Sequence, residues 1–272
     1  MKKLNLFLTL MMITFTVNRT FSQTVNTSAY LNSLPLIELD KSQARSYHMI
    51  TDYYDFNLFG NFRVKTRIIG NLTCKDDSVQ WKDVHSFYSR SLNDEFTGGK
   101  KVNYMENFKY KQGTEVVESD YFIKNLPEAD PLVMNLIWDV LGFDVFAYES
   151  WDSLKLNTEF RASNVNLEME LAFGTFENKD TRITWLGITE VNNELCAILK
   201  YSVMNNPLHL EHGNFMMKGR SHYWGEVYVS LFDKQIEYVS LTEDVLMEVK
   251  EKGSSESDIK YTVRYITMSK VD

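Results

Sequence analysis

Residues 181–204 read TRITWLGITEVNNELCAILKYSVM, two runs rich in branched and aromatic residues on either side of Asn192–Asn193. Such runs favour β-strands, because these side chains pack well on a pleated surface. The two asparagines are typical turn residues. A connection this short joins antiparallel neighbours, since parallel strands need a long crossover. The stretch therefore predicts an antiparallel hairpin.

The same pattern recurs along most of the chain. Strands are predicted at 46–56, 59–74, 79–88, 165–176, 181–191, 195–204, 215–232, 235–249 and 259–271. Turn-forming residues separate them at 76–77, 178–180, 192–193, 205–207, 233–234 and 253–255. Consecutive strands with short connections predict a long, curved antiparallel meander, either a partial barrel or a sandwich.

Residues 131–154 break this pattern. Apolar residues recur at helical spacing, at 132, 133, 136, 137, 140 and 141. Gly142 then interrupts the segment, so two short helices are predicted. Asp139, Asp144 and Glu149 make a membrane span too costly. We expect this helical pair to pack on the concave face of the sheet, because an apolar sheet face must be covered. The predicted fold class is therefore α+β, mainly antiparallel β.

The N-terminus has the three-part layout of a secretory signal peptide. A basic start precedes an apolar run over 4–17 that is too short to span a bilayer. Small residues allow cleavage after Ser22. We expect a signal peptide at 1–22, an irregular lead-in at 23–45 and a single β-rich domain at 46–272, which carries the helical insert.

The charge balance bears on possible partners. The formal net charge is −8 at pH 7, and the predicted signal peptide contains basic residues but no acid, so the exported form is more acidic still. No basic stripe is present in the sequence. Nucleic-acid binding and electrostatic docking to anionic lipid are therefore disfavoured. We expect a periplasmic or extracellular protein, either soluble or peripheral to the outer membrane.

No motif for catalysis or for a cofactor is present: the chain lacks a Gly-x-Ser-x-Gly elbow, a phosphate-binding loop, a dinucleotide fingerprint and Cys-x-x-Cys. The stretch 209–212 (HLEH) has the composition of a metal site, but its side chains converge only if it forms a loop, which Pro207 and Gly213 favour. Solvated loop residues are the simpler interpretation, so we assign no metal. Glu168 and Glu170 share a predicted strand face, and a solvated face explains them better than acid–base chemistry.

Cys74 and Cys196 would meet an oxidising compartment after export. A bond between them would close a loop of about 120 residues, worth about 4–5 kcal/mol in the chain-entropy model. Two buried thiols are the alternative, because cysteine is often buried without a bridge. The sequence leaves both possibilities open.

The aromatic residues suggest where a ligand would bind. Five of them gather in the helical segment, namely Trp138, Phe143, Phe146, Tyr148 and Trp151. They would suit a pocket between helix and sheet for an acyl chain or another hydrophobic ligand. Plain packing of helix on sheet is the alternative.

One segment resembles a known group. The residues KGRSHYWGE at 218–226, followed by YVSL at 228–231 and DKQIEY at 233–238, resemble secreted uncharacterised proteins of Bacteroidetes-type bacteria. This resemblance implies export and supplies no catalytic residue. The inferred architecture is also similar to that of periplasmic lipoprotein carriers, whose open half-barrel is covered by helices.

Three functions follow as hypotheses. The leading one is an exported, non-catalytic domain that binds a hydrophobic ligand or an envelope partner under residues 131–154. The second is a hydrolase of envelope material or glycan, which would need a polar cleft with two carboxylates. The third is a structural or assembly protein with a filled interior and an exposed apolar patch.

Overall fold

The computed structural model describes residues 33–113, 116, 121, 124–125, 131–163, 168–171 and 174–271. The long strands are β1 (Arg45–Asn57), β2 (Phe62–Lys75), β3 (Ser78–Ser89), β9 (Lys179–Val191), β10 (Glu194–His212), β11 (Phe215–Ser230), β12 (Ile236–Glu251) and β13 (Ser257–Val271). The short strands are β4 (Lys100–Lys101), β5 (Lys109–Lys111), β6 (Glu159–Arg161), β7 (Glu168–Leu171) and β8 (Gly174–Glu177). The helical elements are α2 (Pro131–Tyr148) and the 3₁₀ turns η2 (Asn103–Met105) and η4 (Trp151–Ser153).

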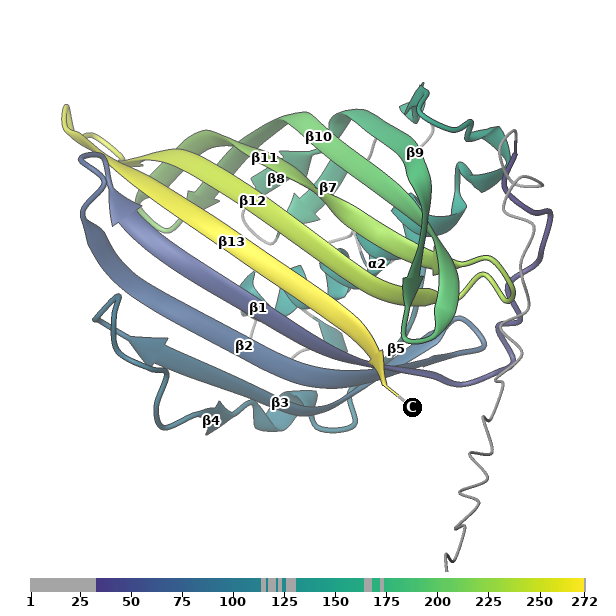
Figure 1. Ribbon diagram of the computed structural model, residues 1–272. Helices are drawn as coiled ribbons and strands as arrows, with labels where there is room; N and C mark the ends of the chain where they lie inside the picture. The colour runs from purple at the N-terminus through teal and green to yellow at the C-terminus, as the bar shows by residue number, and fades with distance from the viewer. Residues whose placement is uncertain are drawn as a thin grey trace, which may run out of the picture.

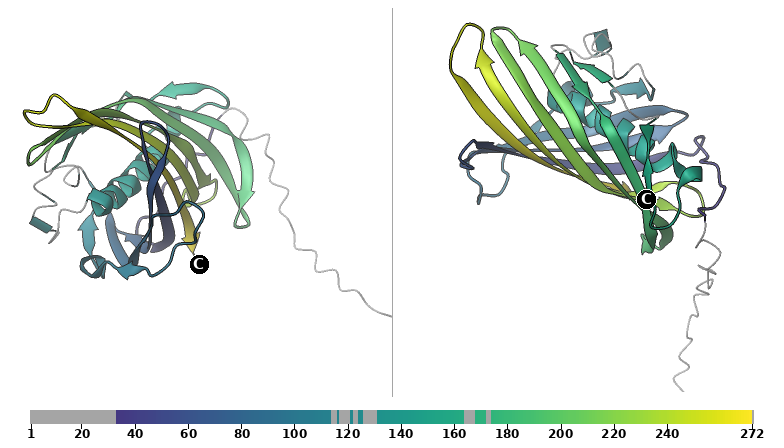
Figure 2. Two further views of the ribbon diagram at one scale, coloured as in Figure 1. Left: turned by 90° about the vertical axis from the view of Figure 1, so that its left-hand side faces the viewer. Right: turned by 90° about the horizontal axis from the view of Figure 1, so that it is seen from above.

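All of these strands belong to one sheet, whose main path runs β4-β3-β2-β1-β13-β12-β11-β10-β8-β7. The long strands pair antiparallel throughout, and the last strand, β13, lies between β1 and β12. The sheet curves into an open trough with α2 on its concave side (Figures 1 and 2). The prediction of a mainly antiparallel, curved sheet is confirmed. The sheet does not fold into a sandwich.

Two-residue turns join several long strands. Asp76 and Asp77 connect β2 to β3 with φ values of 49° and 60°, and Asn192 and Asn193 connect β9 to β10 with 52° and 62°. Positive φ at both central residues matches the right-handed twist of a hairpin, and Asn and Asp tolerate it better than most residues. The hairpin predicted over 181–204 is confirmed.

The helical segment forms one helix rather than the predicted pair. The helix α2 continues through Gly142, and only the short turn η4 follows it. A glycine costs a helix interior about 1 kcal/mol, and burying neighbours such as Val140 and Phe143 outweighs this cost. In the part of the chain that the structure describes, no helix is both long and apolar enough to cross a membrane.

Two predicted strand boundaries are also wrong. β10 runs on through the expected turn at 205–207, where a bulge follows Val203. The buried Asn206 side chain donates a hydrogen bond to the Val203 carbonyl at 3.1 Å and accepts one from the Lys179 amide at 3.3 Å. The polar residues thus form a bulge instead of a turn. Conversely, the strand predicted at 165–176 is divided into β7 and β8, which pair with each other.

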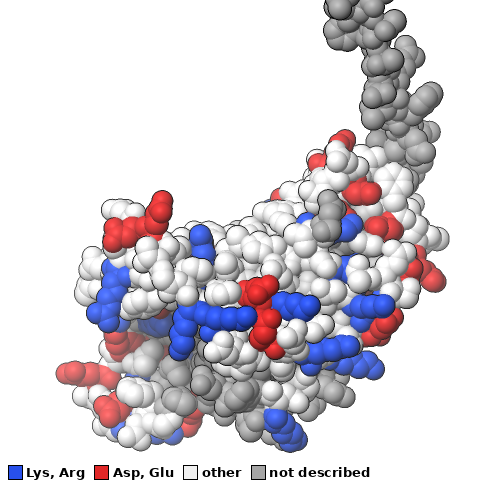
Figure 3. Space-filling model, turned by 90° about the horizontal axis from the view of Figure 1, so that it is seen from below, with Lys and Arg blue, Asp and Glu red and all other residues white. Residues whose placement is uncertain are grey.

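Lysine side chains gather along the open edge of the sheet that β3, β4 and β5 form. Figure 3 shows basic side chains in a band across the underside of the molecule. The edge carries five exposed lysines, at 82, 100, 101, 109 and 111. Their positions are spread along the chain, which is why the sequence shows no basic stripe. Lysines on an edge strand discourage pairing with another chain, and this accounts for them structurally.

Candidate functional site

A cavity of about 470 Å³ lies between α2 and the concave face of the sheet. This volume lies within the range of small-molecule sites. From the helix, Leu132, Asn135, Trp138, Asp139 and Phe146 line it. From the sheet, the apolar part of the wall includes Phe176, Leu208, Leu210, Leu241, Val245 and Met247. The wall can therefore surround an apolar group.

The cavity occupies one end of the trough. An inner row of residues lies side by side across five strands: Thr66, Tyr53, Arg264, Glu243 and Tyr223. An outer row contains Lys260, Met247, Gly219, Leu208 and Phe176. Along β12 the two rows are four residues apart, or about 13 Å. The cavity thus extends from the inner row toward the β1–β2, β10–β11 and β12–β13 hairpins, and we call this end of the trough the cavity end.

A charged cluster lies on the inner row. One guanidinium nitrogen of Arg264 contacts both carboxylate oxygens of Asp139, at 2.6 and 2.7 Å, and another contacts Glu243 at 3.0 Å. The Ser221 hydroxyl donates a hydrogen bond to the second oxygen of Glu243. The side chains of Arg264, Asp139 and Glu243 are only 8%, 11% and 10% exposed. The cluster joins α2 to β13 and β12.

Burial shifts the proton affinities of this cluster. It raises the pKa of Asp139 to about 6, although Arg264 opposes the shift, and the nearby Glu243 raises it further. Burial also raises the pKa of Tyr53, whose ring faces the Arg264 guanidinium at 5.2 Å, to about 12. For Arg264 itself, burial favours the neutral form, but the adjacent negative charges outweigh it and raise the pKa. Of Asp139, Tyr53 and Arg264, Asp139 is therefore the residue whose pKa lies nearest to neutral pH.

A second polar group lies between the two rows. Asp55 accepts a hydrogen bond from the Thr262 hydroxyl at 2.5 Å and lies 3.3 Å from the Lys260 ammonium. Asp55, Thr262 and Lys260 all line the cavity. The cavity thus combines an apolar wall with polar groups that already have partners. Such a site can hold an amphiphilic molecule.

Two of the five predicted site residues line the cavity, and three lie away from it. Trp138 and Phe146 line the cavity, and Phe146 stacks on Tyr201 with ring centroids 4.2 Å apart. Phe143 and Trp151 are buried away from it, and the Trp151 indole donates a hydrogen bond to the Pro35 carbonyl at 2.8 Å. Tyr148 also lies away from the cavity, and its hydroxyl accepts a 3.4 Å hydrogen bond from Arg45 on β1. A ligand-binding role for any of the five stays a prediction.

Sequence reasoning missed the charged cluster. The available signal was strand parity: Glu243 lies between Leu241 and Val245 at inward positions of β12. A charged residue at an inward position needs a partner. The partner could not be identified, because Asp139 and Arg264 are far apart in the sequence.

The other sequence candidates do not form sites in the described residues. The expectation of a loop at 209–212 is wrong, because β10 continues to His212, and the exposed side chains of His209 and Glu211 lie on a strand. Among the residues that the structure covers, no three potential metal ligands cluster. The side chain of Glu168 is exposed on β7.

The two cysteines are buried and unpaired. Burial raises the pKa of both thiols to about 12. Of the two alternatives that the sequence left open, the structure therefore has the buried thiols. Thiols in this condition are poor nucleophiles.

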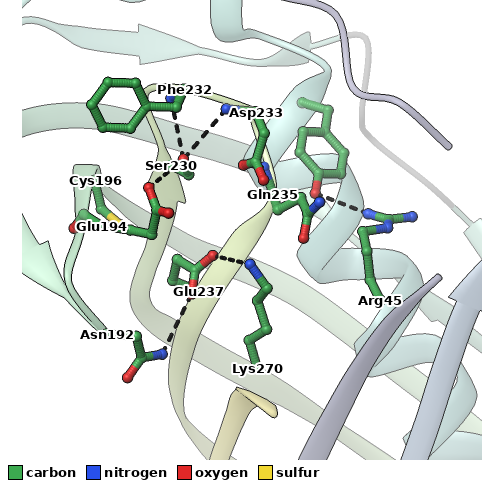
Figure 4. A network of polar contacts seen from close by, with 11 residues as sticks. Arg45, Asn192, Glu194, Cys196, Ser230, Phe232, Asp233, Gln235, Glu237 and Lys270 are labelled. Atoms are coloured by element: carbon green, nitrogen blue, oxygen red, sulfur yellow. Dashed lines mark hydrogen bonds and ion pairs between the residues drawn. The ribbon is translucent and has the colours of Figure 1, made fainter. Parts of the chain in front are cut away.

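At the opposite end of the trough large side chains are buried, among them Tyr47 and Trp81, and polar contacts connect the strands (Figure 4). We call this end the packed end. The buried Glu237 accepts hydrogen bonds from Lys270 at 2.6 Å and from the Asn192 amide at 3.4 Å. Nearby, the Ser230 hydroxyl accepts from the Phe232 amide at 3.1 Å and donates to Glu194 at 3.5 Å. These contacts join β12, β13 and the β9–β10 turn.

No protein-family model matches this chain, and no curated protein matches it. A structure of lipovitellin, described for its lipid–protein interactions, aligns with 84% of this chain and 25% of its own at 10% identity, with a TM-score of 0.35. A DUF1329 family protein from Desulfovibrio piger aligns with 82% of this chain and 84% of its own at 9% identity, with a TM-score of 0.13. This chain thus spans about a quarter of the lipovitellin chain. Both likenesses are too weak to carry an argument, and the resemblance to secreted Bacteroidetes proteins stays an expectation.

Proposed function

We propose that this protein is exported and binds a hydrophobic or amphiphilic molecule in the cavity beneath α2. The observation that carries the proposal is the cavity itself, which has the volume of a ligand site and an extended apolar wall. Leu241, Val245 and Met247 of the sheet and Leu132 and Trp138 of the helix contribute to this wall. The predicted signal peptide at 1–22 supports export.

The geometry favours binding over hydrolysis. The two inner carboxylates, on Asp139 and Glu243, both contact Arg264, and Glu243 also contacts Ser221. A glycosidase needs one carboxyl to donate a proton while the other attacks or activates water. Carboxylates fixed on a shared guanidinium suit a structural connection between helix and sheet better. A purely structural role would not require the hollow cavity end.

Extraction of the exported protein tests the proposal directly. A bacterial host would secrete the protein, which would then be purified without detergent. The mass of the intact protein shows whether cleavage follows Ser22. Organic extraction and mass spectrometry should then reveal a bound lipid-like molecule in near-stoichiometric amount. An empty protein that also takes up no fluorescent acyl probe would contradict the proposal.

A matched pair of substitutions places the ligand. Val245 lines the cavity, whereas the side chain of its neighbour Leu246 is exposed on the other face of β12. We expect Val245→Trp to fill the cavity and weaken acyl-probe binding at least about tenfold, because it removes the space for the probe. Leu246→Trp adds the same bulk outside and should bind like the parent. Equal affinities for the two variants would contradict a ligand in this cavity.

A further inference from the structure

The two ends of the sheet differ in the residues at their turns. At the packed end, the long strands are joined by Asp76–Asp77, Asn192–Asn193 and a turn that contains Asp233 and Lys234. At the cavity end, Leu58 and Phe59 form the tip of the β1–β2 hairpin, and Phe215 and Met216 begin β11 beside the β10–β11 turn. Two of the three hairpins at the cavity end thus carry large apolar residues at or beside their turns, whereas the third, β12–β13, turns through the polar stretch 252–256. The turns of the packed end are polar apart from Phe232 and its neighbour Leu231.

The apolar residues at the cavity end are exposed. Phe59 is 83% exposed, Leu58 61% and Phe215 48%. The β1–β2 turn does not depend on their side chains, because Asn57 holds it by accepting hydrogen bonds from the Phe59 and Asn61 amides at 3.0 and 2.9 Å. Large apolar side chains that the turn does not need, and that water surrounds, point to a partner surface.

These tips lie beside the wall of the cavity. The outer row of the cavity wall includes Lys260, which lies opposite Asn57 at the foot of the β1–β2 tip. Leu210, also in the wall, lies opposite Met217 near the β10–β11 tip. Figure 2 shows the hairpin ends arranged around the open end of the trough, with α2 inside. A partner that contacts the tips would therefore face the cavity.

The charges of this end indicate the kind of partner. Three of its basic residues form ion pairs: Arg63 with Asp258 at 3.1 Å, Lys252 with Glu211 at 2.9 Å and Lys260 with Asp55 at 3.3 Å. Lys218 and Lys250 are further basic residues beside the β10–β11 tip. Glu248 lies opposite Lys218, and Glu251 follows Lys250 in the chain, so these acids offset the two remaining lysines. This balance leaves little attraction for anionic lipid, while exposed Phe and Leu partition into the interfacial layer of a bilayer.

We propose that the cavity end docks on a lipid bilayer through Leu58, Phe59, Phe215 and Met216. The hairpin tips insert into the interfacial layer and bring the cavity mouth against the membrane. Docking goes beyond ligand binding and does not depend on it. If the cavity takes a lipid, docking provides a dry route for that lipid to enter and leave.

Vesicle flotation tests this docking. The exported full-length product should float with phosphatidylcholine vesicles equally at low and high salt. The double variant Phe59→Ser/Phe215→Ser should bind vesicles at least about tenfold more weakly, since partition scales with buried apolar area. Phe232 provides the matched control, because it is 51% exposed in the β11–β12 turn at the packed end, and Phe232→Ser should bind like the parent.

Several results would overturn docking at this end. They are a parent protein that does not float, binding that high salt abolishes, a double variant that floats like the parent, and an equal loss in Phe232→Ser. Binding of a soluble acyl probe in vesicle-free buffer separates the two proposals. It should be unchanged in the double variant, whereas its absence in the parent would count against the cavity and not against docking.

Discussion

The same strands build two unlike ends of the trough, one hollow and one filled. At the packed end, the concave face and its cover hold the largest buried side chains, among them Trp81, Trp185 and Tyr47. At the cavity end, β11 and β13 present Ser221 and Thr262 inward. The backbone curvature continues through both ends, so side-chain volume decides which end is hollow. The charged cluster around Arg264 marks the boundary between them.

The largest expected effect comes from breaking that boundary. We expect Arg264→Met to lower the free energy of unfolding by about 3–5 kcal/mol, because Asp139 and Glu243 would remain buried without their partner. Urea unfolding measures this loss. Arg63→Met is the control, since Arg63 belongs to an exposed ion pair with Asp258, and such pairs contribute about 0–1 kcal/mol. Similar losses in both variants would show that the cluster is not a structural boundary.

Leucine truncation compares the two ends directly. Leu72 is fully buried at the packed end, whereas Leu210 is a partly exposed part of the cavity wall. We expect Leu72→Ala to cost about 2–5 kcal/mol, because it creates a void in a filled core. Leu210→Ala should cost about 1 kcal/mol, because its surroundings are already open. Equal costs, measured by urea unfolding, would mean that the cavity end is packed in solution.

How far the sequence predicts these features depends on whether the signal is local. The hairpin at 181–204 could be predicted because Asn192–Asn193 and the strands beside it carry local signals. The single helix could not, since burial around Gly142 overrides a local preference. The inward position of Cys74 follows from its parity with Ile68 and Leu72, which are also buried.

The sequence predicts a pocket between helix and sheet, with plain packing as the alternative, and the choice between the two is beyond local reasoning for the same reason. The charged cluster unites three distant segments, and the emptiness of the cavity depends on the sizes of side chains that meet only in the folded sheet. Of the aromatic residues predicted from the helix, Trp138 and Phe146 reach the cavity because they lie on the helix face that lines it, while Phe143 lies on the packed face.

The pH dependence of stability tests the burial of Asp139. Its folded-state pKa is raised from 3.8 to about 6, so the folded protein holds this proton more tightly than the unfolded chain does. Acidification from about pH 7 to about pH 4 should therefore stabilise the parent relative to Asp139→Asn, by about 1–3 kcal/mol. Carboxyl groups with lowered pKa values, such as Asp77 and Asp180, act in the opposite direction in both proteins. Parallel stability profiles in urea would contradict a buried, proton-binding Asp139.

The variant with the smallest expected change in stability allows thiol reactivity to be compared between the cavity wall and the buried native cysteines. Val245→Cys replaces a cavity-wall side chain with one of similar size and should alter stability by less than about 1 kcal/mol. Its thiol should react with a small maleimide in the native protein, and an acyl probe should slow that reaction. The native Cys74 and Cys196 should react only after unfolding, because both are buried and their pKa values are raised to about 12. If the new thiol were as unreactive as these two, the cavity end would be closed in solution, and the contrast on which the binding proposal rests would be lost.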